Sequence, residues 1–250
     1  MPFPSESGYD LNRSSTLREA FAASIAERID AAPAEEREAR NYLGASLIGE
    51  PCARRIQYEV LAAPAEPHSA RTLRIFRRGH LFEAEVAGWL RQAGFKVSTL
   101  NPSTLQPYGF SVAKGRFRGH IDGIIFDGPA VDGLTYPCIW ENKALGEKGW
   151  KELVKHGVAR AHPQYADQIA LYQTYMDSQA PALLTAVNAN TMEIWAEAVA
   201  FDPARAQAAS DRAIHILRAI DAGDLLPRIG DDPERFPCGW CRFREHCWKG

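Results

Sequence analysis

Two different spacings of apolar residues divide the chain into helical and extended parts. Apolar positions recur with the helical period in residues 16–32, 51–62, 71–94, 148–158, 162–176 and 203–222. Extended runs, separated by Gly, Asp and Pro turns, cover residues 95–100, 110–126, 136–144, 182–190 and 191–201. This order of helices and strands predicts an α/β fold with a mixed β-sheet flanked by helices.

Length and composition point to one globular domain with a sizeable core. Of the 250 residues, 46% are hydrophobic, and no apolar run reaches the roughly 20 residues that a membrane span needs. The formal net charge of -2 excludes a global basic surface, so a surface for nucleic acid would have to be local. Residues 1–17 are polar, lack the features of a signal peptide and are expected to be mobile. We therefore expect residues 18–250 to form a single cytoplasmic domain, and the helix over 16–32 to be amphipathic.

The segment IWENKAL places two opposite charges inside a predicted strand. Side chains alternate between the faces of a strand, so Glu141 and Lys143 share one face while Trp140 and Asn142 share the other. In the preceding extended run, every second residue belongs to a basic row that ends in a carboxylate. This row, which would share one face of a strand, consists of Lys114, Arg116, Arg118, His120 and Asp122. A hairpin between the two runs would place Asp122 beside Glu141. Adjacent carboxylates favour a bridging cation such as Mg²⁺ or Mn²⁺, and the alternative is an ordinary ion pair between Glu141 and Lys143.

Two predicted helices add polar side chains to this picture. His80 lies on an apolar helical stripe, which predicts that it faces the interior, either as a hydrogen-bonded core residue or as a metal ligand. The other residues of that stripe are Leu73, Phe76, Ala84 and Ala87. On a later helix, Gln164, Gln168 and Tyr172 follow at intervals of four and share one face. The alternative for this second helix is a tyrosine-rich core helix with polar edges.

Four of the five cysteines suggest a metal site. A C-x2-C-x5-C cluster near the end of the chain consists of Cys238, Cys241 and Cys247, and Cys52 lies far upstream. Clustered thiols in a reducing compartment favour zinc or an iron–sulphur cluster over disulfides. His246 would complete a local Cys3His zinc site, and buried thiols without metal are the remaining alternative. We expect Cys138 to be buried in its strand.

Taken in order, these polar segments resemble the PD-(D/E)XK nuclease superfamily. GHIDGII and WENKAL resemble its signature, RRGHLFE resembles the metal-binding helix of the RecB-like branch, and QIALY matches the Q-x-x-x-Y motif of that branch. The resemblance implies a restriction-endonuclease-like fold and a Mg²⁺ or Mn²⁺ site formed by His80, Asp122, Glu141 and the carbonyl of Asn142. Lys143 would assist the attacking water, and Gln168 and Tyr172 would lie at the active site and position the DNA.

The cysteines resemble those of the iron–sulphur exonucleases. One early cysteine followed by three near the end is similar to the AddB-type nuclease domain and to the fourth CRISPR-associated protein family, and PCARR resembles the context of their first cysteine. The resemblance implies a structural [4Fe-4S] cluster held by Cys52, Cys238, Cys241 and Cys247. This cluster would clasp the Cys-rich segment, residues 236–250, to the N-terminal region.

The resemblance covers about residues 43–247 and implies a metal-dependent deoxyribonuclease. Within that class, we expect an exonuclease that prefers single-stranded DNA. Candidate DNA contacts are Arg77, Arg78, Lys114, Arg116, Arg118 and Gln164. Trp140, Trp150 and Tyr165 are expected either to stack on unpaired bases or to be buried. Because the sequence has no phosphate-loop motif, unwinding would need a helicase; a recombinase or a CRISPR adaptation complex are other candidate partners. The competing hypotheses are a non-catalytic DNA-binding or adaptor subunit and a nuclease clasped by zinc.

Overall fold

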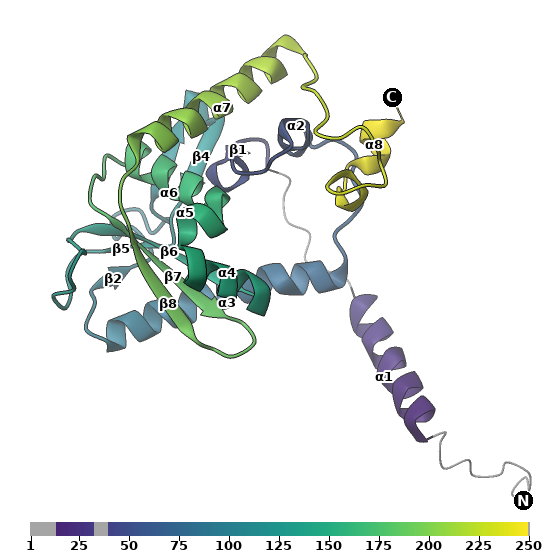
Figure 1. Ribbon diagram of the computed structural model, residues 1–250, viewed down its shortest axis with the longest axis horizontal. Helices are drawn as coiled ribbons and strands as arrows, with labels where there is room; N and C mark the ends of the chain where they lie inside the picture. Colours follow the sequence, from purple (N-terminus) through teal and green to yellow (C-terminus); the bar gives the residue numbers. More distant parts are fainter. Residues whose placement is uncertain (1–13, 33–39, 250) are drawn as a thin grey trace, which may run out of the picture.

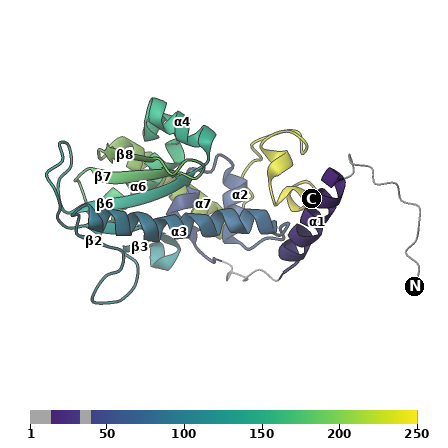
Figure 2. The same cartoon turned by 90° about the horizontal axis from the view of Figure 1, so that it is seen from below.

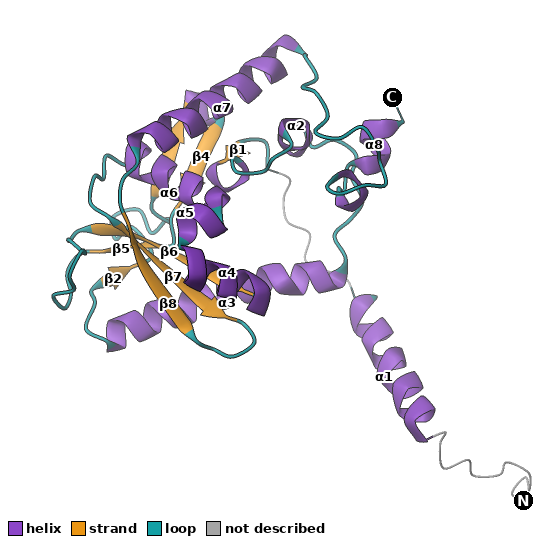
Figure 3. Ribbon diagram, viewed as in Figure 1, coloured by secondary structure: helices purple, strands orange, loops and turns teal. Residues whose placement is uncertain are grey.

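The computed structural model describes residues 14–32 and 40–249 and has the expected α/β class, with helices flanking two sheets (Figure 3). Its strands are β1 (Leu43–Gly44), β2 (Val97–Ser98), β3 (Gly109–Val112), β4 (Phe117–His120), β5 (Gly123–Ile125), β6 (Cys138–Leu145), β7 (Ala182–Asn188) and β8 (Ile194–Val199). Its α-helices are α1 (Ser14–Asp30), α2 (Ala53–Val60), α3 (Ala70–Gln92), α4 (Glu147–His156), α5 (Val158–Ala161), α6 (Pro163–Tyr175), α7 (Pro203–Ala222) and α8 (Arg244–Trp248). Short 3-10 turns are η2 (Ala45–Leu47), η3 (Ala113–Gly115) and η4 (Cys238–Trp240).

The larger sheet is mixed and contains the charged strand β6. Its strand order is β2-β5-β6-β7-β8, with β6 and β7 parallel and the other pairs antiparallel. In the β5–β6 hairpin, Gly123 pairs with Trp140. The next step of this register brings Asp122 beside Glu141, so the predicted hairpin is confirmed.

The smaller sheet corrects one expectation from the sequence. The run 110–126 is not one strand: β3 and β4 form a hairpin in a sheet of order β1-β4-β3, and the chain then crosses to β5 in the larger sheet. The hairpin turns at η3, where Lys114 and Gly115 have φ of 57° and 81°. Such backbone cannot continue a strand. The alternating basic row is therefore broken at both of its ends.

Helices cover both faces of the larger sheet. On one face, Val86 and Ala87 of α3 pack with Trp140 of β6 and Val187 of β7 (Figure 2). On the other face, α6 lies against the sheet and is covered by α7 in turn (Figure 1). The side-chain alternation of β6 therefore sends Trp140 toward α3 and Glu141 toward α6.

Helix α1 stands apart from the rest of the molecule (Figure 1). Its location matches the predicted helix, but it does not bury an apolar face: Phe21, Ile25 and Ile29 are all exposed. Its end is held by an ion pair between Asp30 and Arg74 of α3, 2.6 Å apart. Of the segment expected to be mobile, residues 1–13 lie outside the described residues, and α1 begins at Ser14. Among the described helices, none is long and apolar enough to cross a membrane.

Candidate active site

Strand β6 sets the two charges of IWENKAL side by side. Lys143 Nζ lies 2.6 Å from Glu141 Oε1, and the Glu141 side chain is almost wholly buried. Asn142 points to the opposite face, where its Oδ1 accepts a hydrogen bond from Thr185, which also accepts from the indole of Trp140. This polar chain locks the strand orientation, so the predicted face assignment is confirmed.

Asp122 occupies the crossover between the two sheets. Its Oδ2 accepts a hydrogen bond from the backbone N–H of Asn142 at 2.7 Å, which fixes the carboxylate beside that of Glu141. Both carboxylates line a cavity of about 560 Å³ between the two sheets, α3 and α6. Lys143 reaches the same cavity, so the predicted Asp, Glu and Lys triplet converges on one space.

The two carboxylates and the lysine perturb one another strongly. Burial, the charge of Glu141 and the charge of Glu83 raise the pKa of Asp122 well above its usual range. Burial also raises the pKa of Glu141, although Lys143 opposes this effect. For Lys143, burial favours the neutral amine, but the carboxylates of Glu141 and Asp122 outweigh it and raise its pKa. The site therefore combines a strained carboxylate pair with a protonated lysine.

A hydrogen-bonded chain from α6 closes one wall of the cavity. Gln168 Oε1 accepts from Lys143 Nζ at 3.3 Å, and Gln168 Nε2 donates to the hydroxyl of Tyr172 at 2.7 Å. That hydroxyl donates in turn to the carbonyl of His120 at 2.7 Å. Gln168 and Tyr172 are both buried and both line the cavity. The Q-x-x-x-Y pair thus orients the lysine and ties α6 to the end of β4.

The placement of His80 differs from the sequence expectation. His80 lines the same cavity, but its side chain is 55% exposed, so the prediction that it faces the interior is wrong. The reason is that the first half of α3 extends beyond the sheet that buries its second half. His80 Nδ1 lies 3.2 Å from the carboxylate of Glu83. Glu83 also lines the cavity and was missed, although its place three residues after His80 is the spacing of one helix face.

The donor set at the cavity fits a hard divalent cation. Glu141 Oε2 is buried and has no hydrogen-bond partner among the described residues, which is costly unless something binds it. Two neighbouring carboxylates with raised pKa values also gain from a cation between them. As the side chains lie, the described residues contain no group of three or more His, Cys, Asp or Glu that could hold a metal. His80 would have to turn away from Glu83 to join the two carboxylates, and the role of the Asn142 carbonyl stays a prediction.

Of the predicted DNA contacts, only Arg118 lines the cavity. Its guanidinium lies over the ring of Tyr42, 4.9 Å from the centroid. Arg116 instead pairs with Asp221 of α7, and Lys114 sits in the turn at η3, because the basic row is broken there. Arg77, Arg78 and Gln164 are not among the residues that line the cavity. Arg40, Tyr42 and Ser46 do line it, and no sequence pattern pointed to them.

The aromatic residues proposed to stack on bases differ in burial. Trp140 is fully buried and donates its indole N–H to Thr185, which removes it from any surface role. Trp150 is partly buried against the core. Tyr165 is also partly buried, and Lys143 Nζ lies 4.9 Å from the centre of its ring. Tyr165 therefore faces the active site from α6.

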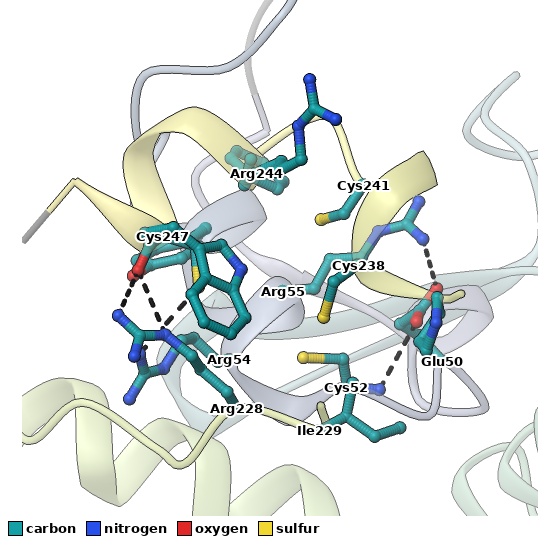
Figure 4. Close-up of a pocket in the computed structure, with 14 residues that line it drawn as sticks. Glu50, Cys52, Arg54, Arg55, Arg228, Ile229, Cys238, Cys241, Arg244 and Cys247 are labelled. Carbon is teal, nitrogen blue, oxygen red and sulfur yellow. Dashed lines mark hydrogen bonds and ion pairs between the residues drawn. The ribbon is translucent and has the colours of Figure 1, made fainter. Parts of the chain in front are cut away.

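The four predicted cysteine ligands gather in a second pocket, beside α2. Cys52 precedes α2, and the other three come from the Cys-rich segment. In Figure 4 the side chains of Cys52, Cys238 and Cys241 face one another, whereas Cys247 lies beside Arg54, with 3.9 Å between its Sγ and Arg54 Nη1. Burial and the neighbouring thiols Cys52 and Cys247 raise the pKa of Cys238, and burial raises that of Cys241. As these side chains lie, they too do not form a metal-holding group of three or more among the described residues, so their role as metal ligands stays a prediction.

The remaining ligand candidates lie elsewhere. His246 does not line this pocket; its ring stacks edge-on against Tyr58, 4.9 Å away. Cys138 is buried in β6, as predicted, and burial raises its pKa to about 11. The arrangement therefore favours the set with Cys52 over a local Cys3His site.

Comparison with known proteins supports the fold at low sequence identity. No family model matches the chain, and no curated protein matches it either. An alkaline exonuclease, LHK-Exo from Laribacter hongkongensis, has 13% identity and a TM-score of 0.51 over 79% of this chain and 93% of its own. The same exonuclease in complex with dAMP gives 13% identity and 0.50 over 73% and 89%. SSO0001 is more distant, with 13% identity and 0.44 over 94% and 97%. The chain thus has a fold like that of this exonuclease.

Replacing Asp122 by asparagine is expected to stabilise the metal-free protein at neutral pH by about 1–2 kcal/mol. Because the pKa of Asp122 is raised in the folded protein, the protonated carboxyl favours folding and the ionised carboxylate opposes it. The stabilising contribution of protonated Asp122 is therefore present in acid and is lost as pH rises through the folded pKa. Asparagine removes that charge and can still accept the Asn142 N–H. Urea unfolding in metal-free buffer should therefore show the gain at pH 8 and a smaller gain at pH 5.5.

Asp132→Asn is the matched control, because Asp132 is an exposed aspartate outside the cavity. It should leave both the stability and its dependence on pH unchanged. Equal pH dependence in wild type and Asp122→Asn would show that Asp122 is not a strained carboxylate.

Proposed function

We propose that the protein is a metal-dependent deoxyribonuclease that hydrolyses phosphodiester bonds. The observation that carries the proposal is the pairing of partly buried Asp122 with buried Glu141, which is bonded to Lys143, at an open cavity. Stability alone does not favour placing two carboxylates with raised pKa values together. Their resemblance to the PD-(D/E)XK signature and the exonuclease-like fold both support a nuclease.

Asp122 and Glu141 would hold one or two Mg²⁺ or Mn²⁺ ions, with His80 and the Asn142 carbonyl as further ligands. The ion would supply Lewis-acid chemistry, by favouring ionisation of a water and by neutralising charge on the phosphate. Carboxylate and carbonyl oxygens suit these hard cations. Within the described residues, Glu141 Oε2 is a buried carboxylate oxygen without a hydrogen-bond partner, and such a cation would satisfy it.

Lys143 would act as a cation in the reaction rather than as a strong base. Its raised pKa keeps the ammonium protonated at neutral pH, and Glu141 and Gln168 fix its position. From there it can orient a water and stabilise charge that develops on the phosphate. Gln168 and Tyr172 position this ammonium, and Arg118 is available for a phosphate contact.

DNA is proposed as the substrate, and attack from an end of a single strand as the preferred mode. The structural neighbour is named an alkaline exonuclease and was solved with dAMP, which supports cleavage of DNA. The preference for single strands rests on the resemblance to iron–sulphur exonucleases. Unwinding of duplex DNA would then be the task of a separate helicase partner.

The test uses single- and double-stranded DNA labelled at either the 5′ or the 3′ end, with Mg²⁺ or Mn²⁺ at several salt concentrations. We expect short labelled products from one end of the single strand and slower loss of the duplex. Absence of cleavage by folded wild-type protein under all these conditions would refute the nuclease proposal and favour a DNA-binding or adaptor subunit.

We further propose that Cys52, Cys238, Cys241 and Cys247 hold a [4Fe-4S] cluster that joins the Cys-rich segment to α2. Their convergence in one pocket and the resemblance to iron–sulphur exonucleases support this assignment. Protein purified without oxygen should be brown, with a broad visible absorbance band and about four iron atoms per chain. A colourless protein that contains zinc would instead support the zinc-clasped alternative.

A further inference from the structure

One face of α3 leads out of the candidate active site. Glu83 and His80 line the cavity, and Arg77 and Phe76 lie three and four residues before His80. At 3.6 residues per turn, these four side chains share one side of the helix. We name this surface, formed by Phe76, Arg77, His80 and Glu83, the α3 stripe. It continues the wall of the cavity for about one turn toward the start of the helix.

The outer half of the α3 stripe is open and carries groups suited to nucleic acid. The side chain of Phe76 is 44% exposed, and Arg77 is exposed as well. Within the described part of the chain, Arg77 has no carboxylate within ion-pair distance, whereas Arg74 is paired with Asp30. An exposed aromatic ring next to an uncompensated guanidinium offers one surface for a base and one charge for a phosphate.

The Cys-rich segment supports the far end of this stripe. The ring of Phe76 meets His68 edge-on at 5.2 Å, and His68 Nε2 lies 2.9 Å from Arg242 Nη1. Nearby, the backbone N–H of Glu66 donates to the carbonyl of Arg242 at 2.8 Å. Phe76 is therefore supported by His68, which in turn contacts Arg242, the residue that follows Cys241.

We propose that the α3 stripe binds the single strand of DNA next to the scissile phosphate, with a base stacked on Phe76 and a phosphate held by Arg77. Three observations favour this occupant: the stripe is continuous with the cavity, it has an exposed ring, and Arg77 supplies positive charge. Acidic groups around the stripe in the described part of the chain include Glu83, which faces His80, Glu59, which lies 3.9 Å from Arg242, and Asp30, which pairs with Arg74. The inference rests on the proposed nuclease function and names the substrate path of that site.

The experiment measures binding of labelled oligothymidylates of about 4 and about 20 nucleotides by fluorescence anisotropy, with Ca²⁺ in place of Mg²⁺. Phe76→Ala and Arg77→Ala are each expected to weaken binding of the long strand about tenfold, because the first loses a stacked base and the second loses a phosphate contact. The short strand should bind as it does to wild type, since it does not reach the outer half of the stripe.

Two neighbouring residues on α3 supply matched controls. Ile75 is as exposed as Phe76 but points about 140° away from His80, and Arg71 is exposed on the opposite side of the helix. Ile75→Ala and Arg71→Ala should leave long-strand binding unchanged. If all four variants bind the long strand equally well and the wild type cleaves DNA, the proposed DNA binding by the α3 stripe is wrong, whereas the proposed nuclease function stands. A wild type that neither binds nor cleaves DNA would overturn both.

Discussion

Lys143→Ala is expected to lower the rate of DNA cleavage by about three orders of magnitude, while the protein stays folded and keeps the proposed iron–sulphur cluster. The Lys143 ammonium pairs with Glu141 at 2.6 Å, and both Glu141 and Gln168 hold it in place. Alanine would remove the charge that stabilises the phosphate during attack. The measurement is the single-turnover rate on an end-labelled single strand with saturating Mn²⁺.

Lys151→Ala is the matched control, because Lys151 is an exposed lysine that pairs with Glu147 at 2.7 Å outside the cavity. It should cleave at the wild-type rate. Circular dichroism and the visible spectrum should show that Lys143→Ala is folded, since the loss of the Glu141 partner also costs stability. A folded Lys143→Ala protein with wild-type activity would place the catalytic group elsewhere.

Cys241→Ala is expected to bleach the protein and to lower its free energy of unfolding by about 3–5 kcal/mol. The four cysteines come from the start of α2 and from the Cys-rich segment, so a shared cluster would close a very long loop. The measurements are iron content per chain and urea unfolding without oxygen. The Cys-rich segment should also become sensitive to proteolysis in the variant.

Cys138→Ala separates the loss of a cluster from the loss of a buried thiol. Cys138 is buried in β6 and lies outside the cysteine pocket, so its replacement should cost some stability but leave iron content unchanged. Other contacts also hold this region, since Gln57 of α2 bonds to the backbone of Asp224 and Leu226 after α7. If Cys241→Ala keeps both its colour and its unfolding midpoint, the cysteines do not form the proposed clasp.

The order of the elements and the core of the active site could be predicted from the sequence because both follow from local periodicity. Alternation within one strand suffices to place Glu141 and Lys143 on one face, and β6 is a single unbroken strand. The spacing of four residues on α6 similarly places Gln168 beside Tyr172. These inferences need no knowledge of how distant segments pack.

The wrong predictions are those that required tertiary information. The basic row assumed that one strand runs from Lys114 to Asp122, whereas the left-handed backbone at Lys114 and the crossover after His120 divide it between two sheets. The burial of His80 was inferred from its apolar neighbours on α3, but that half of the helix has no sheet to cover it. Arg40 reaches the cavity through a loop, and a loop has no periodicity that could reveal this.

The most direct test of the central claim is a Mn²⁺ titration of single-strand cleavage by wild type and Glu141→Gln side by side. Glutamine keeps an oxygen that can accept from Lys143, so the change removes mainly the charge that would bind the ion. The account predicts products that increase with Mn²⁺ in wild type and fall about a thousandfold in the variant. Equal rates for the two folded proteins, or cleavage that does not depend on divalent ions, would contradict a metal-dependent nuclease centred on Asp122 and Glu141.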